Sequence, residues 1–229
     1  MSWKVTTPKL GYPNIQATDS EQKWPIGTIV TAVDPEFGEG EFIYLPGVAN
    51  TVVGDVVLYN LLTKTTTRCP ATGGVGQIAI AMSPNVAGQW GWYQISGAAV
   101  MRANDAIAAG AQLYMAAIGA VDDASAAGED IKSAISLAAA GANLSARGAH
   151  TVSGSKIITV DSLDGLFVGC TVAGTGIASG SVITGIGPAA GLYTNQIEVD
   201  KAATATGSTT MTPATTGYVV AAVNRPFIV

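Results

Sequence analysis

Short runs of alternating or β-branched apolar residues recur along the chain, with Gly, Pro, Asn and Asp between them. Alternation places successive side chains on opposite faces of a strand. Many short strands separated by turn residues are typical of a β-sandwich or β-barrel. We therefore predict strands at residues 28–33 (TIVTAV), 41–45 (EFIYL), 55–59 (DVVLY), 77–82 (QIAIAM), 91–100 (GWYQISGAAV) and 112–115 (QLYM).

Two segments, residues 104–109 and 123–127, are rich in Ala and are the only ones that favour a helix. Gly110 and Gly128 follow them closely, and glycine weakens a helix because it loses much backbone entropy there. We expect at most two short helical turns. The predicted fold class is all-β, with a barrel-like or sandwich-like core.

Residues 149–213 form a second series of short strands in a segment richer in Gly, Thr and Ser. Residues 217–229 (GYVVAAVNRPFIV) then return to the pattern of the first part. This order predicts a small β-domain, residues 149–213, inserted into a core domain made of residues 25–148 and 214–229. Such insertions are tolerated where the two ends of the inserted domain lie close together.

The first 24 residues lack a helical or strand period and contain several Pro and Gly residues, so we predict an extended N-terminal arm. Aromatic side chains on an isolated arm cannot be buried, and we expect them to lie on a partner. A disordered terminus is the alternative. The candidate contact residues are Trp3, Tyr12, Pro13 and Trp24.

The segment TVAGTGIASGSVITGI (171–186) has glycine spacing similar to that of a dinucleotide-binding loop, with Glu198 further along. Such a loop needs a helix directly after it, because the helix N-terminus faces the phosphates. Here β-branched residues and further glycines follow Gly180, so no helix is expected. The glycines, Gly174, Gly176 and Gly180, instead predict a turn between two strands.

Charged residues make up 12% of the 229 residues, about half the usual share, and the formal net charge is −5. This composition argues against a broad nucleic-acid-binding face, and no apolar stretch is long enough for a membrane-spanning helix. A weakly charged surface favours a soluble chain that is covered in part by partner subunits. Cys69 and Cys170 are expected to be free thiols in a reducing compartment.

Few residues suggest chemistry. The single histidine, His150, offers neither a metal site nor a catalytic triad, so we expect no metal, no cofactor and no enzymatic activity. Trp90, Trp92 and Tyr93 fit the two faces of a packed sheet, or a stacking platform for a carbohydrate or a base beside Gln94. The acidic group fits solvated turns better than a calcium site, and a glycosidase pair has no positive support; it comprises Asp122, Asp123, Glu129 and Asp130.

Two parts of the chain also resemble known groups of proteins. Residues 153–186 and 196–212 resemble a small β-module of phage structural and bacterial surface proteins, carried by the pattern "G-x-G-I-x-x-G-(S/T)-x-V" and a final "A-T-x-T-G". Residues 25–148 and 214–229 resemble the head-decoration (capsid cement) proteins of tailed bacteriophages. The shared features are "EFIYLPGV", "GDVV.Y", "G..GWYQISG.A" and "V..VNRPF".

The resemblance implies a structural virion protein that binds the outer surface of an assembled phage capsid and stabilises it. It also implies a homotrimer, with a dimer as the alternative, and a major capsid protein as partner. Synthesis would take place in the host cytoplasm and the final location would be the capsid exterior. A tail-fibre or surface adhesin module that binds host glycans is the second hypothesis, and a hydrolase is the third.

Overall fold

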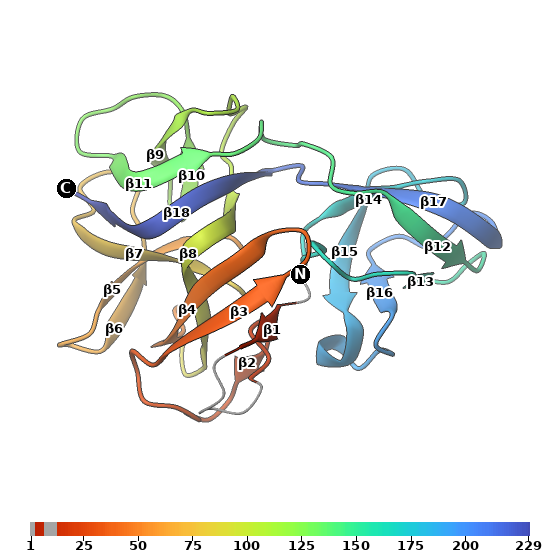
Figure 1. Cartoon of the computed structure of the whole chain (residues 1–229), viewed down its shortest axis with the longest axis horizontal. Helices are drawn as coiled ribbons and strands as arrows, with labels where there is room; N and C mark the ends of the chain where they lie inside the picture. Colours follow the sequence, from red (N-terminus) through yellow and green to blue (C-terminus); the bar gives the residue numbers. More distant parts are fainter. Residues whose placement is uncertain (1–2, 7–12) are drawn as a thin grey trace. The chain divides into compact units, whose positions relative to one another are not determined.

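In the computed structural model, which describes residues 3–6 and 13–229, the chain divides into two compact units (Figure 1). The core unit comprises Trp3–Gly141 and Gly217–Val229, and the inserted unit comprises Ala142–Thr216. Both are built of antiparallel strands, so the fold is all-β. The predicted insertion limits, 149 and 213, fall inside strands, because the first and last strands of the inserted unit extend beyond them.

The described part of the core unit forms a twelve-stranded sheet. Its main path runs β1-β3-β4-β8-β7-β18-β11-β9-β10, while β2 pairs with β8 and β5 lies between β6 and β7. The strands are β1 (Lys4–Val5), β2 (Thr18–Asp19), β3 (Ile29–Asp34), β4 (Gly38–Pro46), β5 (Val56–Asn60), β6 (Thr65–Arg68), β7 (Gly76–Ala81), β8 (Trp90–Arg102), β9 (Gln112–Ala117), β10 (Ala120–Asp122), β11 (Asp130–Ser136) and β18 (Tyr218–Ile228).

Both faces of the central strands are buried. On β7, Ile78 and Ile80 belong to one apolar cluster, whereas Ala79 and Ala81 belong to a second cluster. Alternating side chains point to opposite faces of a strand, so β7 separates two layers of core. Burial on both faces explains why the QIAIAM run contains so few polar residues.

Strand β18 changes partner along its length. It pairs with β8 from Tyr218 to Asn224 and with β7 from Phe227 to Ile228. Arg225 lies between these ladders with a φ of +48°, a conformation that non-glycine residues rarely adopt. The sequence NRPF therefore marks a local irregularity that redirects the strand.

The two predicted helical segments, 104–109 and 123–127, are not helical. Their carboxylates bond the backbone groups that a helix would need: Asp105 Oδ1 accepts from Ala106 N, and Asp123 Oδ2 accepts from Ala108 N. Short acidic side chains compete with helical hydrogen bonds in this way. Alanine content alone was therefore a misleading signal.

The inserted unit is a closed barrel with strand order β12-β13-β16-β15-β14-β17. Its interior holds Ile158, Phe167, Ile183, Ile197 and Met211, all fully buried. The strands are β12 (Arg147–Thr151), β13 (Ile157–Val160), β14 (Thr171–Ala173), β15 (Ser181–Ile186), β16 (Gln196–Val199) and β17 (Gly207–Ala214), with a short 3₁₀ helix, η2 (Gly187–Ala190), between β15 and β16.

Candidate functional site

The glycine-rich segment of the inserted unit is a turn between two strands, as predicted. Thr171 pairs with Val182 and Val172 pairs with Ser181, so β14 and β15 are antiparallel neighbours. Gly176 and Gly180 have φ values of +80° and +65° in the connection, where glycine is favoured because it lacks a Cβ. The segment has no helix N-terminus that could hold a phosphate.

Trp92 and Tyr93 of β8 are buried, in agreement with the packed-sheet interpretation, whereas Trp90 at the start of the strand is partly exposed. Trp92 packs against Tyr44 and Trp24, with ring centroids 5.1 and 5.4 Å away. The Tyr44 hydroxyl donates to Asp19 Oδ2 at 2.9 Å, and burial raises the pKa of Tyr44 to about 12. Gln94 is also buried, and its Nε2 donates to two backbone carbonyls. This cluster offers no stacking platform on Trp92.

The described residues of the predicted arm pack on the core unit. Trp3 is buried against Phe37 and Phe42, the latter at a centroid distance of 4.9 Å. Strand β1 pairs with β3, and β2 pairs with β8. Pro13 is buried, whereas Trp24 is partly exposed. Tyr12 lies outside the described residues.

The expectation that the aromatic side chains of the arm are buried only against a partner is therefore wrong for Trp3, which is buried against residues of the same chain. The partners that bury Trp3 come from strands distant in the sequence, so the pattern of the first 24 residues alone carries no sign of them. Among the described candidates, Trp24 retains an exposed surface that a partner could contact.

The acidic residues near β10 and β11 act as turn and surface residues. Asp122 Oδ1 accepts from Ala124 N at 3.1 Å, which is an Asx turn. Asp130 forms an ion pair with Lys132 and accepts from Gln112 Nε2. Within the described residues, no three His, Cys, Asp or Glu side chains lie close enough together to hold a metal ion.

A buried ion cluster at the start of β5 was not predicted from the sequence. Asp55 is fully buried, and its carboxylate pairs with Arg68 Nε at 2.8 Å and Arg102 Nη1 at 2.5 Å. It also accepts from Val52 N, while Arg68 Nη2 donates to Ile118 O. The Asp55 carboxylate thus links the start of β5 to β6 and β8, and Arg68 extends the cluster to the β9–β10 turn. The only sign of this ion cluster in the sequence was the aspartate of the motif "GDVV.Y".

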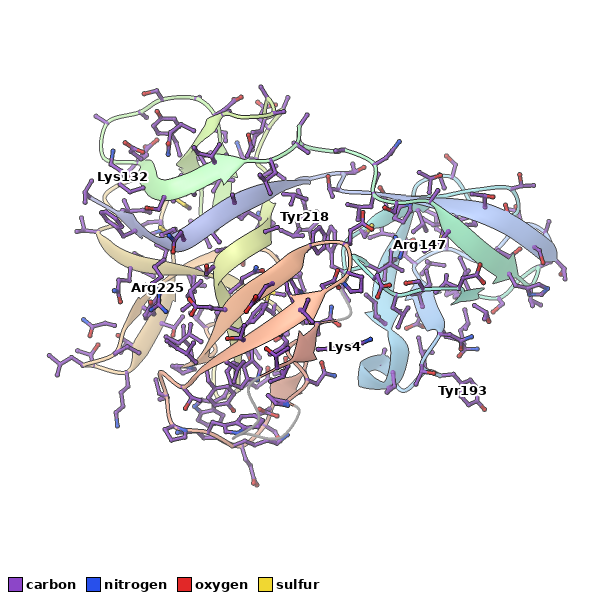
Figure 2. All side chains as sticks on the ribbon, viewed as in Figure 1. Lys4, Lys132, Arg147, Tyr193, Tyr218 and Arg225 are labelled. Carbon is purple, nitrogen blue, oxygen red and sulfur yellow. The ribbon has the colours of Figure 1, made fainter. Side chains whose placement is uncertain are left out.

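Arg147 has a comparable position in the inserted unit, where it is labelled in Figure 2. Its Nη1 donates to Ser162 O and Asp164 O, and its Nη2 donates to Ser145 O. The guanidinium fixes the connection between β13 and β14 through carbonyl groups. Its role is therefore structural.

Both cysteines are free and buried. Burial raises the pKa of the Cys69 thiol to about 12 and that of the Cys170 thiol to about 11. A nucleophilic cysteine needs a lowered pKa and access to solvent. Neither thiol has the environment of a reactive site.

Two surface features remain after these assignments. Tyr193, labelled in Figure 2, lies beside β16 of the inserted unit and is 78% exposed. Its backbone N–H donates to Gln196 Oε1. In the core unit, the β5–β6 hairpin carries exposed leucines beside a groove of about 430 Å³. These are the candidate binding surfaces of the described chain.

Comparison with known proteins identified no relative. No family model, no curated protein and no solved structure matches the chain. None of the helices in the described residues has the length and apolar character that crossing a bilayer requires.

Proposed function

We propose that this chain is a capsid decoration protein of a tailed bacteriophage, which binds the outer surface of the assembled shell and stabilises it. The observation that carries the proposal is the arrangement of the segments that resemble decoration proteins. EFIYLPGV lies on and just after β4, GWYQISG lies on β8, and VNRPF lies on β18.

These three segments are neighbours in one sheet. Tyr44 pairs with Trp92 across β4 and β8, and Asn224 pairs with Ser96 across β18 and β8. The resemblance thus covers one continuous structural element, which supports a shared fold more than a chance match of separate strands. The residues concerned are largely buried, so they account for the fold and leave the capsid-binding surface to residues with accessible area, such as the partly exposed Trp24.

The mechanism follows from binding linkage. A protein that binds the assembled lattice but not the free subunits shifts the equilibrium toward the lattice. Several copies of a symmetric oligomer would add modest contacts by avidity. No chemical step is required, and the major capsid protein is the partner that the proposal names.

The test is co-sedimentation of the full chain with undecorated, expanded capsids encoded by the same genome, across a concentration series. We expect saturable binding and a higher temperature of capsid disruption. Absence of binding up to about 100 µM, where even a weak interface would be detected, would contradict the proposal.

A second candidate, a surface adhesin module that binds host glycans, is favoured by Tyr193. An exposed tyrosine beside Gln196 offers an apolar ring next to hydrogen-bonding groups. A glycan array probed with the full chain and with Tyr193→Ala distinguishes the candidates. Glycan binding that is lost in the variant, without capsid binding, would favour the adhesin.

A further inference from the structure

The Asp55 cluster contains more positive than negative charge. Arg68 and Arg102 both pair with the single carboxylate of Asp55, at 2.8 and 2.5 Å. The other ion pairs of the described residues each join one cation to one carboxylate; they are Lys23–Asp19, Lys132–Asp130 and Arg225–Glu41. Among these ion pairs, an excess of positive charge is therefore found only at Asp55.

The two guanidinium groups meet at one oxygen atom and still have donors to spare. Arg68 Nη2 and Arg102 Nη1 both donate to Asp55 Oδ1, at 3.3 and 2.5 Å. Within the part of the chain that the structure describes, Arg68 Nη1 and the Nε and Nη2 of Arg102 have no acceptor, and none of these nitrogen atoms is buried. The two side chains are 20% and 30% exposed. An anion in solution can therefore reach these donors.

We propose that Arg68 and Arg102 form a binding site for a phosphate group. A guanidinium presents parallel N–H donors whose spacing fits two oxygens of one phosphate. Two neighbouring guanidinium groups supply donors for several of these oxygens, and their excess positive charge favours a dianion over a neutral ligand. The site goes beyond the proposed function and does not depend on capsid binding.

The two arginines are already held in place without a ligand. The Asp55 carboxylate that joins them is fully buried and also accepts from Val52 N. Arg68 Nη2 is fixed further by the carbonyl of Ile118, at 3.1 Å. Side chains that are ordered before binding lose little conformational entropy when a ligand arrives.

Arg147 of the inserted unit lacks these properties. Its Nη atoms donate to backbone carbonyls, and the residue is only 9% exposed. Its Nε is buried without a partner. The guanidinium of Arg147 is therefore closed to an anion from solution, whereas those of Arg68 and Arg102 are accessible.

The formal net charge of the chain, −5, opposes the approach of an anion. Salt screens this long-range repulsion beyond about 10 Å at an ionic strength of about 0.1 M, and contacts at hydrogen-bond distance are screened less. The contacts with the two arginines thus determine binding. We expect a weak site, with a dissociation constant of about 1 mM.

The test titrates the full chain with inorganic phosphate and, separately, with glycerol 3-phosphate, while sodium chloride keeps the ionic strength constant. Urea unfolding measures binding, because a ligand that binds only the folded chain stabilises it. We expect a saturable rise of the urea midpoint. Binding of either ligand supports the site, and the tighter ligand shows whether it prefers free phosphate or a phosphate ester.

Variants locate the binding site. Arg102→Gln should weaken phosphate binding at least about tenfold, because it removes one of the two charged donor groups. Arg225→Gln is the matched control, since Arg225 is also a partly exposed arginine but is paired one to one with Glu41. In the wild type, the NMR resonances of the Nε–H groups of Arg68 and Arg102 should shift with phosphate, which requires no substitution.

Asp55→Asn gives a result that a purely structural ion cluster would not. The substitution destabilises the chain, but it also removes the carboxylate that competes with phosphate for both guanidinium groups. Phosphate should therefore bind this variant at least about threefold more tightly and raise its urea midpoint more than that of the wild type.

The proposal is overturned if neither ligand at about 20 mM changes the urea midpoint beyond the effect of chloride at equal ionic strength. Equal affinities of the Arg102→Gln and Arg225→Gln variants would place the anion elsewhere on the chain and also overturn it. Resonances of Arg68 and Arg102 that do not respond to phosphate would have the same meaning.

Discussion

Asp55 carries a fully buried charge that holds three strands of the core unit together. Its side chain is fully buried, and Arg68 and Arg102 neutralise it from two other strands. A buried carboxylate is tolerated only when it is paired and hydrogen-bonded. The backbone N–H of Val52 provides a further donor. The cluster therefore fixes the beginning of β5 against its neighbours.

We expect Asp55→Asn to lower the free energy of unfolding by about 3–5 kcal/mol, because it leaves two partly buried guanidinium groups without their counter-charge. Glu41→Gln is the control: Glu41 pairs with Arg225 at 2.9 Å near the surface, and an exposed pair contributes about 1 kcal/mol or less. Urea unfolding of the three proteins measures the difference. Equal effects of the two substitutions would show that Asp55 has no special role.

The two buried thiols make stability depend on pH. Burial raises the pKa of Cys69 from 9.0 to about 12 and that of Cys170 from 9.0 to about 11. Because the folded pKa is higher than the unfolded one, the unfolded chain loses these protons first as the pH rises. The stabilisation is complete below pH 9 and is lost progressively between pH 9 and the folded values.

We expect the free energy of unfolding to fall above pH 9 by up to about 1.4 kcal/mol per pH unit for each thiol that ionises only in the unfolded chain. Cys69→Ala should reduce this slope, even though it lowers stability at neutral pH. Urea titrations at pH 7 and at alkaline pH, with reductant present, provide the measurement. An unchanged slope in the variant would remove Cys69 as the cause.

At the scale of elements, the N-terminal segment is part of the core unit. Strand β1 pairs with β3, and Trp3 packs edge-on against Phe42. Deletion of residues 1–22 would remove β1 and β2 together with Trp3. We therefore expect this truncation to destabilise the core unit, so it cannot serve as a clean test of partner binding.

Trp3→Ala isolates this packing. We expect it to lower the free energy of unfolding by about 3 kcal/mol, since loss of a buried aromatic side chain removes apolar contacts and leaves a cavity. Lys4→Ala changes the exposed neighbour of Trp3 at the start of β1 and should alter stability by less than about 0.5 kcal/mol. Thermal and urea unfolding distinguish the two. A neutral Trp3→Ala would mean that the segment is only loosely attached.

Strands were predicted correctly from the sequence where a run of apolar side chains marks them. The segments at 41–45, 77–82 and 91–100 correspond to β4, β7 and β8. Strand β6, with the sequence TTTR, was not predicted because its threonines carry no apolar pattern. Its pairing with β5 is a tertiary interaction, which a local pattern does not contain.

The candidate surfaces were less predictable than the strands. Leu61 and Leu62 are visible in the sequence as an apolar pair, but such a pair is usually buried. Their exposure depends on the Asn60 turn, and the groove is assembled from β5, β6 and the segment before β7. The Asp55 cluster likewise joins residues 13 and 47 positions apart. These arrangements follow from sheet register, which the sequence left open.

At the scale of the whole molecule, the chain enters and leaves the inserted unit through two segments that lie side by side. Thr215 N donates to Ala142 O at 2.9 Å, and Asn143 forms a bridge with Ala214. On the core side, Gly141 N donates to Tyr218 O at 3.1 Å. Adjacent ends make an insertion compatible with independent folding of both units.

We expect a chain that lacks residues 142–216, with Gly141 joined to Gly217 through a short Gly-Ser linker, to fold as the core unit alone. Gly141 N donates to the carbonyl of Tyr218, the residue after Gly217, so the two ends already lie close together and closing a short loop there costs little conformational entropy.

The isolated segment 142–216 should also fold, because its barrel is closed and has its own buried interior. Circular dichroism and urea unfolding of the two fragments provide the measurement, and each should show a β-sheet spectrum with one cooperative transition. A core fragment without cooperative unfolding would mean that the core unit requires the inserted barrel, and the division into two independent folding units would then be wrong.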